Sequence, residues 1–151
     1  MTSVPLDVDS RILEAIKNQT DKLQFGESNW LMVGSRAEPS ISQLFSGRTI
    51  AANSYEDAEP DVPWGATGIG IGLSATYNSS ATKGVRLEIY YGWPVANYDT
   101  DAFREIDHPF GAGETRQKTY IFPVLGVFIR IRVRNLDPSY SVSVDLWSKF
   151  I

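Results

Sequence analysis

The chain has 151 residues, 42% of them hydrophobic and 21% charged, which is enough length and apolar content for one ordinary globular domain. Since it has no cysteine and one histidine, the sequence excludes a disulfide framework, a thiolate metal site, a cysteine nucleophile and a multi-histidine metal site within one chain. The net charge of −4 argues against a sequence-independent nucleic-acid binder, which needs a basic excess to neutralise phosphates.

The first seven residues contain no basic region followed by an apolar run, so they do not resemble a signal peptide. No apolar stretch approaches the roughly 20 residues that a helix needs to cross a bilayer. We therefore expect a soluble protein that is not secreted by the classical route and that has no membrane partner.

One helix is predicted, from Asp9 to Gln24, where charged residues surround a narrow apolar stripe. Asp9 or Ser10 can cap its first turn, and Gly26 suits the position just past its end. A helix of this length is marginal alone in water, so it must pack on its own domain or on copies of itself. The second alternative rests on a spacing like that of a coiled-coil seam, formed by Ile12, Ile16, Gln19 and Leu23.

The segment from residue 30 to 65 has weaker signals. Residues 30–33 read as a short buried strand, and residues 41–45 as either a turn or a strand. Residues 46–65 are interrupted by glycine and proline and predict a long loop, which is either a solvated connection or a functional segment. Within it, residues 55–61 contain four acids and no base: Glu56, Asp57, Glu59 and Asp61.

From Ala66 onward, apolar and polar residues alternate with a period of two. In the first run, at 68–77, the outward row is almost bare because it contains Gly68, Gly70 and Gly72. These glycines are followed by neither the helix nor the lysine of a phosphate-binding loop. We expect them to let a backbone or a bulky side chain approach closely.

Further strands are predicted at 85–91, 102–110, 118–123, 127–134 and from 140 to the C-terminus. Six or seven strands without helical crossovers predict a mostly β fold, an antiparallel β-sandwich or jelly roll with one short N-terminal helix. We expect an N-terminal arm and helix at 1–29 and a sandwich domain at 30–151.

Catalytic chemistry has little support. A serine or threonine nucleophile normally needs a general base beside it, and His108 is the only candidate of the usual type. It precedes Pro109 at the end of a probable strand. Glu88 and Glu105 could form the carboxylate pair needed for glycoside hydrolysis. Each acid also has a neighbouring arginine, Arg86 or Arg104, so cross-strand ion pairs explain the two acids equally well. The four acids of the 46–65 segment could bind calcium, although they lack the order of an EF-hand loop. We expect no enzyme activity, no cofactor, no metal and no small-molecule substrate.

Three arginines, Arg130, Arg132 and Arg134, should line one outer strand face together with Phe128. They would repel one another unless anionic groups lie opposite. The sequence leaves three alternatives: acids on neighbouring strands such as Glu88 or Asp145, the acidic segment of an adjacent copy, or a nucleic acid or anionic glycan. The second alternative predicts a subunit interface formed by Phe128 and these arginines and by Glu56, Asp57, Glu59 and Asp61.

A separate hypothesis concerns carbohydrate. Trp64, Trp93 and Tyr98 fall in predicted loops or turns, where aromatic rings could stack on sugars. These three residues would be the glycan-binding residues of a carbohydrate- or receptor-binding sandwich.

The second half of the chain, from Gly84–Tyr91 to Trp147, resembles small β-sandwich proteins of tailed bacteriophage virions. The sequence Gly-Glu-Thr-Arg-Gln at 113–117 and Arg-Val-Arg-Asn-Leu-Asp at 132–137 carry the resemblance. Such proteins include capsid decoration, or cement, proteins, which bind the outside of the shell and are commonly trimers. The resemblance implies a non-enzymatic structural protein located in the virion, whose partners are copies of itself and other virion proteins.

Overall fold

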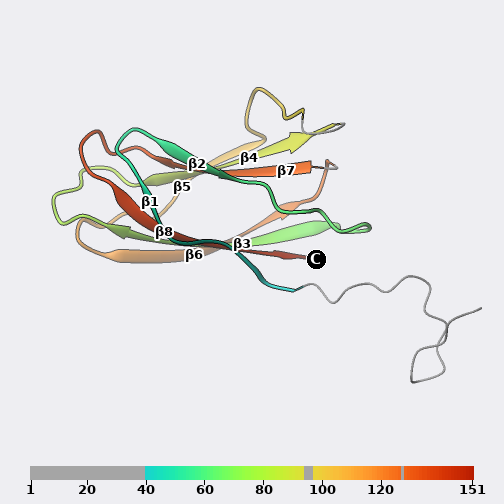
Figure 1. Ribbon diagram of the computed structural model, residues 1–151, viewed down its shortest axis with the longest axis horizontal. Helices are drawn as coiled ribbons and strands as arrows, with labels where there is room; N and C mark the ends of the chain where they lie inside the picture. The colour runs from blue at the N-terminus through green and yellow to red at the C-terminus, as the bar shows by residue number, and fades with distance from the viewer. Residues whose placement is uncertain (1–39, 94–96, 127) are drawn as a thin grey trace, which may run out of the picture. The chain divides into compact units, whose positions relative to one another are not determined.

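The computed structural model describes residues 40–93, 97–126 and 128–151 (Figure 1). The predicted helix at 9–24, with the candidate seam residues Ile12, Ile16 and Leu23, lies outside the described residues, as does the predicted strand at 30–33. The described part of the chain holds no helix that could span a bilayer.

Eight strands form two four-stranded antiparallel sheets, which Figure 1 shows as two layers. The first sheet has the order β1 (Ser42–Ile50), β8 (Val142–Phe150), β3 (Gly68–Tyr77), β6 (Thr115–Pro123). The second has the order β2 (Tyr55–Ala58), β7 (Phe128–Asn135), β4 (Val85–Gly92), β5 (Arg104–Asp107). The mostly β, antiparallel sandwich expected from the sequence is therefore present.

The strand pairing follows one simple rule. The first strand pairs with the last, the second with the seventh, the third with the sixth, and the fourth with the fifth. Two more ladders, β3 with β8 and β4 with β7, complete the sheets. Eight strands paired in this way in two sheets form a jelly roll.

The core lies between the sheets and is formed by the inward rows that the alternation predicted. On β3, Ile69, Ile71 and Leu73 are completely buried, and on β7 so are Ile131 and Val133. Their outward neighbours remain partly exposed, which is the burial pattern of strands with one face in the core.

The structure corrects the prediction of a long loop at 46–65. Residues 41–45 belong largely to a strand, β1, which continues to Ile50. A turn with Asn53 at φ 53° leads to β2 at Tyr55, so most of the acidic segment is an edge strand paired with β7. The error arose because β1 contains two register shifts, which hide its period-two pattern.

Two other strands also differ from expectation. The extended run predicted at 102–110 contains only four strand residues, Arg104–Asp107. The period-two alternation predicts an exposed outward row on β4, but Glu88 and Tyr90 of that row are also buried, with exposed fractions of 3% and 9%. Side chains from β7 cover that row.

Two buried polar residues join the turns at one end of the sandwich. The Asn135 amide donates to the carbonyls of Ile50, Ala51 and Tyr140. The Asp137 carboxylate accepts hydrogen bonds from four backbone amides, those of Thr82, Lys83, Ser139 and Tyr140, at 2.6–3.0 Å. Burial alone would raise the pKa of Asp137, but these amides outweigh burial and hold the pKa well below its ordinary value.

Candidate functional site

The arginine stripe, formed by Arg130, Arg132 and Arg134 of β7, lies on the outer face of the second sheet. Its charges are paired within the chain. Arg132 makes a two-pronged contact with Asp57 of β2, at 2.7 and 2.9 Å. Arg134 makes a similar contact with Glu88 of β4, at 2.6 and 3.2 Å. Arg130 donates to Glu59 at 2.8 Å. Pairing with acids of the same chain, the first alternative from the sequence, is what the structure shows.

Of the two neighbouring-strand acids named from the sequence, one is correct. Glu88 is the partner of Arg134, whereas Asp145 belongs to the first sheet and accepts a hydrogen bond from the Gly47 amide at 2.7 Å. The prediction of a subunit interface assumed that these three arginines lack partners in their own chain, but each of them has one. An assembly role for this face stays a prediction.

The remaining members of the predicted interface are dispersed. Glu56 pairs with Arg48 of β1 at 3.0 Å, Asp61 is exposed beyond the end of β2, and Phe128 is half-buried opposite Gly92. Among the described residues, no group of three or more His, Asp or Glu side chains is placed to hold a metal ion. Three of the four acids considered as calcium ligands, Glu56, Asp57 and Glu59, pair instead with Arg48, Arg132 and Arg130.

Tyrosine rings reinforce this network. The Arg132 guanidinium lies 3.7 Å from the centre of the Tyr55 ring and 5.2 Å from that of Tyr90, and Arg130 lies 3.9 Å from that of Tyr98. The Tyr90 hydroxyl donates to Glu88 at 2.7 Å. Burial would raise the pKa of Glu88, but the hydrogen bonds from Arg134 and Tyr90 hold that pKa below its ordinary value. Tyr98 therefore belongs to this cluster, and its role in glycan binding stays a prediction.

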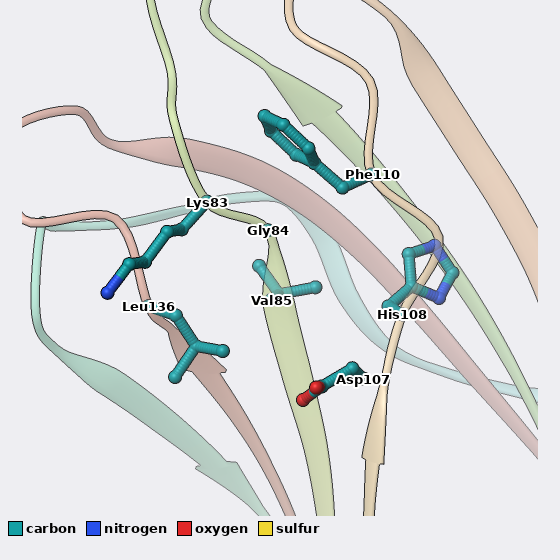
Figure 2. Close-up of a pocket in the computed structure, with 7 residues that line it drawn as sticks. All are labelled: Lys83, Gly84, Val85, Asp107, His108, Phe110 and Leu136. Atoms are coloured by element: carbon teal, nitrogen blue, oxygen red, sulfur yellow. The ribbon is translucent and has the colours of Figure 1, made fainter.

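The cavity around His108 offers no catalytic pair (Figure 2). It has a volume of about 390 Å³ and lies between β4 and β5, with Lys83, Asp107 and Phe110 on its walls. His108 is buried, and its Nδ1 lies 2.8 Å from the Tyr120 hydroxyl while Nε2 lies 3.0 Å from the Arg116 carbonyl. Because a carbonyl only accepts, Nε2 carries the proton and Nδ1 accepts from Tyr120. Burial lowers the pKa of His108, which favours the neutral side chain. Through its two hydrogen bonds, His108 connects the end of β5 to β6.

The two carboxylates considered for glycoside hydrolysis lie directly opposite each other in the register of β4 and β5. Each binds an arginine, Glu88 through Arg134 and Glu105 through Arg86 at 3.1 Å. Cross-strand ion pairs, the alternative to a catalytic pair, therefore account for both.

Three loops bring apolar side chains together at another end of the sandwich. Trp64, in the β2–β3 connection, has an exposed fraction of 99%, Trp93 after β4 has 58%, and Leu125 between β6 and β7 has 52%. They border a cavity of about 320 Å³, which we call the aromatic loop end. Its other lining residues are Val62, Pro63, Gly65, Ala66, Val124 and Gly126. Apart from the indole N–H groups of Trp64 and Trp93, no side chain of this lining carries a charge or a hydrogen-bonding group.

Backbone contacts hold the aromatic loop end in place. The Ala66 amide donates to the Pro63 carbonyl at 3.1 Å, which closes the turn carrying Trp64, and the Val124 amide donates to the Thr67 carbonyl at 3.0 Å. Gly126 allows its neighbours to pack closely, since an added Cβ would lie 3.0 Å from the Tyr91 Cβ and 3.2 Å from the Phe128 carbonyl oxygen, tighter than ordinary contact. The exposed side chains are therefore displayed by an ordered scaffold.

Sequence analysis grouped Trp64 and Trp93 with Tyr98 as candidate glycan-binding residues and missed Leu125. The available signal was the apolar dipeptide Val124-Leu125 placed between two strands, where polar turn residues are usual.

A second surface missed from the sequence covers the outer face of the first sheet. Gly70 and Gly72 form the floor of a shallow groove of about 460 Å³, with Trp147 on one side and Ile121 on the other. The expectation that these glycines admit a bulky side chain is confirmed at Gly72, where an added Cβ would lie 3.7 Å from the Trp147 ring. Three large apolar side chains around the groove are exposed: Ile41 at 70%, Ile121 at 72% and Ile151 at 60%.

Comparison with known proteins gives no family. No family model matches the chain, and no curated protein sequence matches it either. Among solved structures it is similar to a protein described as "Family 16 Carbohydrate Binding Module-2", with 13% identity, a TM-score of 0.41, and coverage of 80% of this chain and 90% of that one.

Proposed function

We propose that the protein is a non-enzymatic structural protein that binds copies of itself and attaches to a larger assembly through the aromatic loop end. The larger assembly would be the virion of a tailed bacteriophage, where the protein would act as a capsid decoration protein. The virion rests on the sequence resemblance at 84–147. Eight-stranded jelly rolls occur in both viral capsid proteins and lectins, so the fold is compatible with this role without specifying it.

The observation that carries the proposal is the exposure of Trp64. A tryptophan that is 99% exposed on an ordered turn leaves its whole apolar area in water, which folding of the described domain does nothing to relieve. Trp93 and Leu125 extend the same patch. Exposed aromatic residues grouped in this way are typical of protein interfaces, where tryptophan is enriched among the residues that dominate binding.

The chemistry of the lining favours a protein partner. Because its side chains offer no charge and no hydrogen-bonding group except the indole N–H groups of Trp64 and Trp93, binding would depend mainly on burial of apolar area. Attachment would stabilise the assembly by mass action, since only the folded and bound protein contributes.

The test is binding of Trp64→Ala and Trp93→Ala variants to purified particles that lack the protein. Each substitution removes an interfacial aromatic ring, so we expect binding to weaken by about 30-fold, equivalent to about 2 kcal/mol. Tyr140→Ala is the matched control, because Tyr140 is 37% exposed but lies on neither surface described above. Particle binding that both tryptophan variants retain would refute the attachment site.

The same residues favour carbohydrate as a second candidate ligand. The structure brings Trp64 and Trp93 to one cavity, and two indole rings can stack on the apolar faces of sugar rings. A glycan array distinguishes the two candidates. A glycan signal that Trp93→Ala abolishes, together with no particle binding, would support the carbohydrate ligand instead of a protein partner.

A further inference from the structure

We infer that two copies of the chain associate face to face through the groove on the outer face of the first sheet. This inference rests on the proposed self-association and specifies its surface, which is separate from the aromatic loop end. The occupant of the groove is the same groove of a second copy.

The first argument is the register of the outward side chains. On one level across the sheet, Lys149 of β8 stands beside Gly70 of β3, which stands beside Ile121 of β6. On the next level, Trp147 stands beside Gly72, which stands beside Thr119. Bulky residues of β8 and glycines of β3 therefore form a ridge and a furrow that run side by side along the strands.

The second argument is that this ridge and furrow are self-complementary. A two-fold axis that runs along the strands, midway between β8 and β3, places β8 of each copy over β3 of the other. Rotation about that axis keeps every residue on its own level. Trp147 then lies over Gly72 of the second copy, and Lys149 lies over Gly70 of the second copy. The same patch of both copies then forms the contact, as in an isologous interface, with the Trp147 ring of each copy also beside Gly72 of its own chain.

The third argument concerns the edges of the face. Ile41 lines the groove, and it continues the β1–β8 register, in which Ser42 pairs with Ser148, to the level of Lys149. The same axis places Ile41 of one copy over Ile121 of the other. Both are more than two-thirds exposed in one copy, so their mutual contact would bury the apolar area that the single domain leaves in water.

The area of the face is also suitable. Four strands about 4.8 Å apart and about nine residues long at about 3.3 Å each give roughly 570 Å² per copy, and roughly 1,100 Å² for the pair, enough for a specific interface. Lys149 lies next to the last residue of β8, where its stem can cover Gly70 while its ammonium group stays in water.

The experiment is the mass of the full chain in solution, measured over a range of concentrations by sedimentation. We expect reversible formation of a dimer that Ile121→Glu weakens at least about 30-fold, because it places an unpaired carboxylate at the contact. Tyr140→Glu, which adds the same charge away from the face, should leave the mass unchanged. Since Ile121 is 72% exposed, circular dichroism should show an unaltered fold for Ile121→Glu.

The absence of native cysteine allows a geometric test. Chains with Ile41→Cys alone and chains with Ile121→Cys alone, mixed and treated with a short bis-maleimide, should give a cross-linked heterodimer. Ile121→Cys chains alone should cross-link much less, because the axis places the two copies of that residue at opposite edges of the face.

The outcomes separate this inference from the proposed function. A chain that stays monomeric at all concentrations overturns both the self-association and its surface. An oligomer whose mass Ile121→Glu leaves unchanged overturns this surface alone. Loss of the dimer by Ile121→Glu, with the mass of Trp64→Ala unaffected, supports the assignment of the two surfaces to two different partners.

Discussion

The two outer faces of the sandwich use their exposed positions in opposite ways. The face of β2, β7, β4 and β5 carries many charged and aromatic side chains, yet they bind one another. The face of β1, β8, β3 and β6 carries glycines and a few large apolar residues that nothing in the described domain covers. The comparison teaches that a row of charged residues need not be a binding surface, because residues on neighbouring strands can pair with the charges. For an exposed apolar face, in contrast, no partner is found within the described domain.

The largest expected effect comes from removing the arginine that pairs with the most buried acid of the charged face. Arg134→Met leaves the Glu88 carboxylate, whose side chain is 4% exposed, without its two-pronged partner. An uncompensated buried charge destabilises a protein strongly, so we expect unfolding free energy to fall by about 3 kcal/mol in urea titrations. Arg130→Met is the control, because its partner Glu59 is 45% exposed, and a surface pair contributes less than about 1 kcal/mol. Equal losses in the two variants would contradict the view that burial makes the difference.

An intermediate effect should follow acidification. The pKa values of Glu88 and Asp137 are both lowered in the folded protein. Such carboxylates add stability above their unfolded pKa values of about 4, and that stability is lost as pH falls through the folded pKa values. The urea midpoint should therefore decrease below about pH 4. Glu88→Gln should show a flatter decrease than the unaltered protein, and an identical pH profile would disprove the contribution of Glu88.

The smallest expected effect concerns the bare face. Glycine inside a strand costs about 0.5–1 kcal/mol relative to alanine, and an alanine Cβ at Gly72 would only touch the Trp147 ring at 3.7 Å. We expect Gly72→Ala to raise the unfolding free energy by about 0.5 kcal/mol while it weakens self-association. At Gly126 the added Cβ would clash, so Gly126→Ala should destabilise by about 1 kcal/mol or more. A destabilised Gly72→Ala variant would mean that folding, rather than binding, requires the glycine.

The sequence predicted what depends on local alternation. The inward rows of β3 and β7 follow from a period of two, and Glu88 could be identified as an arginine partner because it belongs to an outward row of a clear strand. Asp57 could not be assigned in this way. Its strand, β2, has only four residues, two of them acidic, so its pairing with β7 is set by tertiary register rather than by strand propensity.

The two candidate surfaces show the same limit. Trp64 and Trp93 are recognisable as loop aromatics, but their proximity to Leu125 depends on where three separate connections meet. The groove needs the neighbours of Gly70 and Gly72 on both sides, and those are contributed by β6 and β8, more than 40 residues later in the chain. Sequence alternation contains no information on which strands become neighbours.

The position of β8 has a consequence for biosynthesis. It is the last of the eight strands, yet it lies between β1 and β3 in the first sheet, and Gln43 pairs with Trp147. A ribosome releases β1 and β3 long before the strand that joins them, so neither can complete its hydrogen-bond ladder during most of translation. The first sheet therefore closes only after β8 has been synthesised, and such distant pairings make for slow folding.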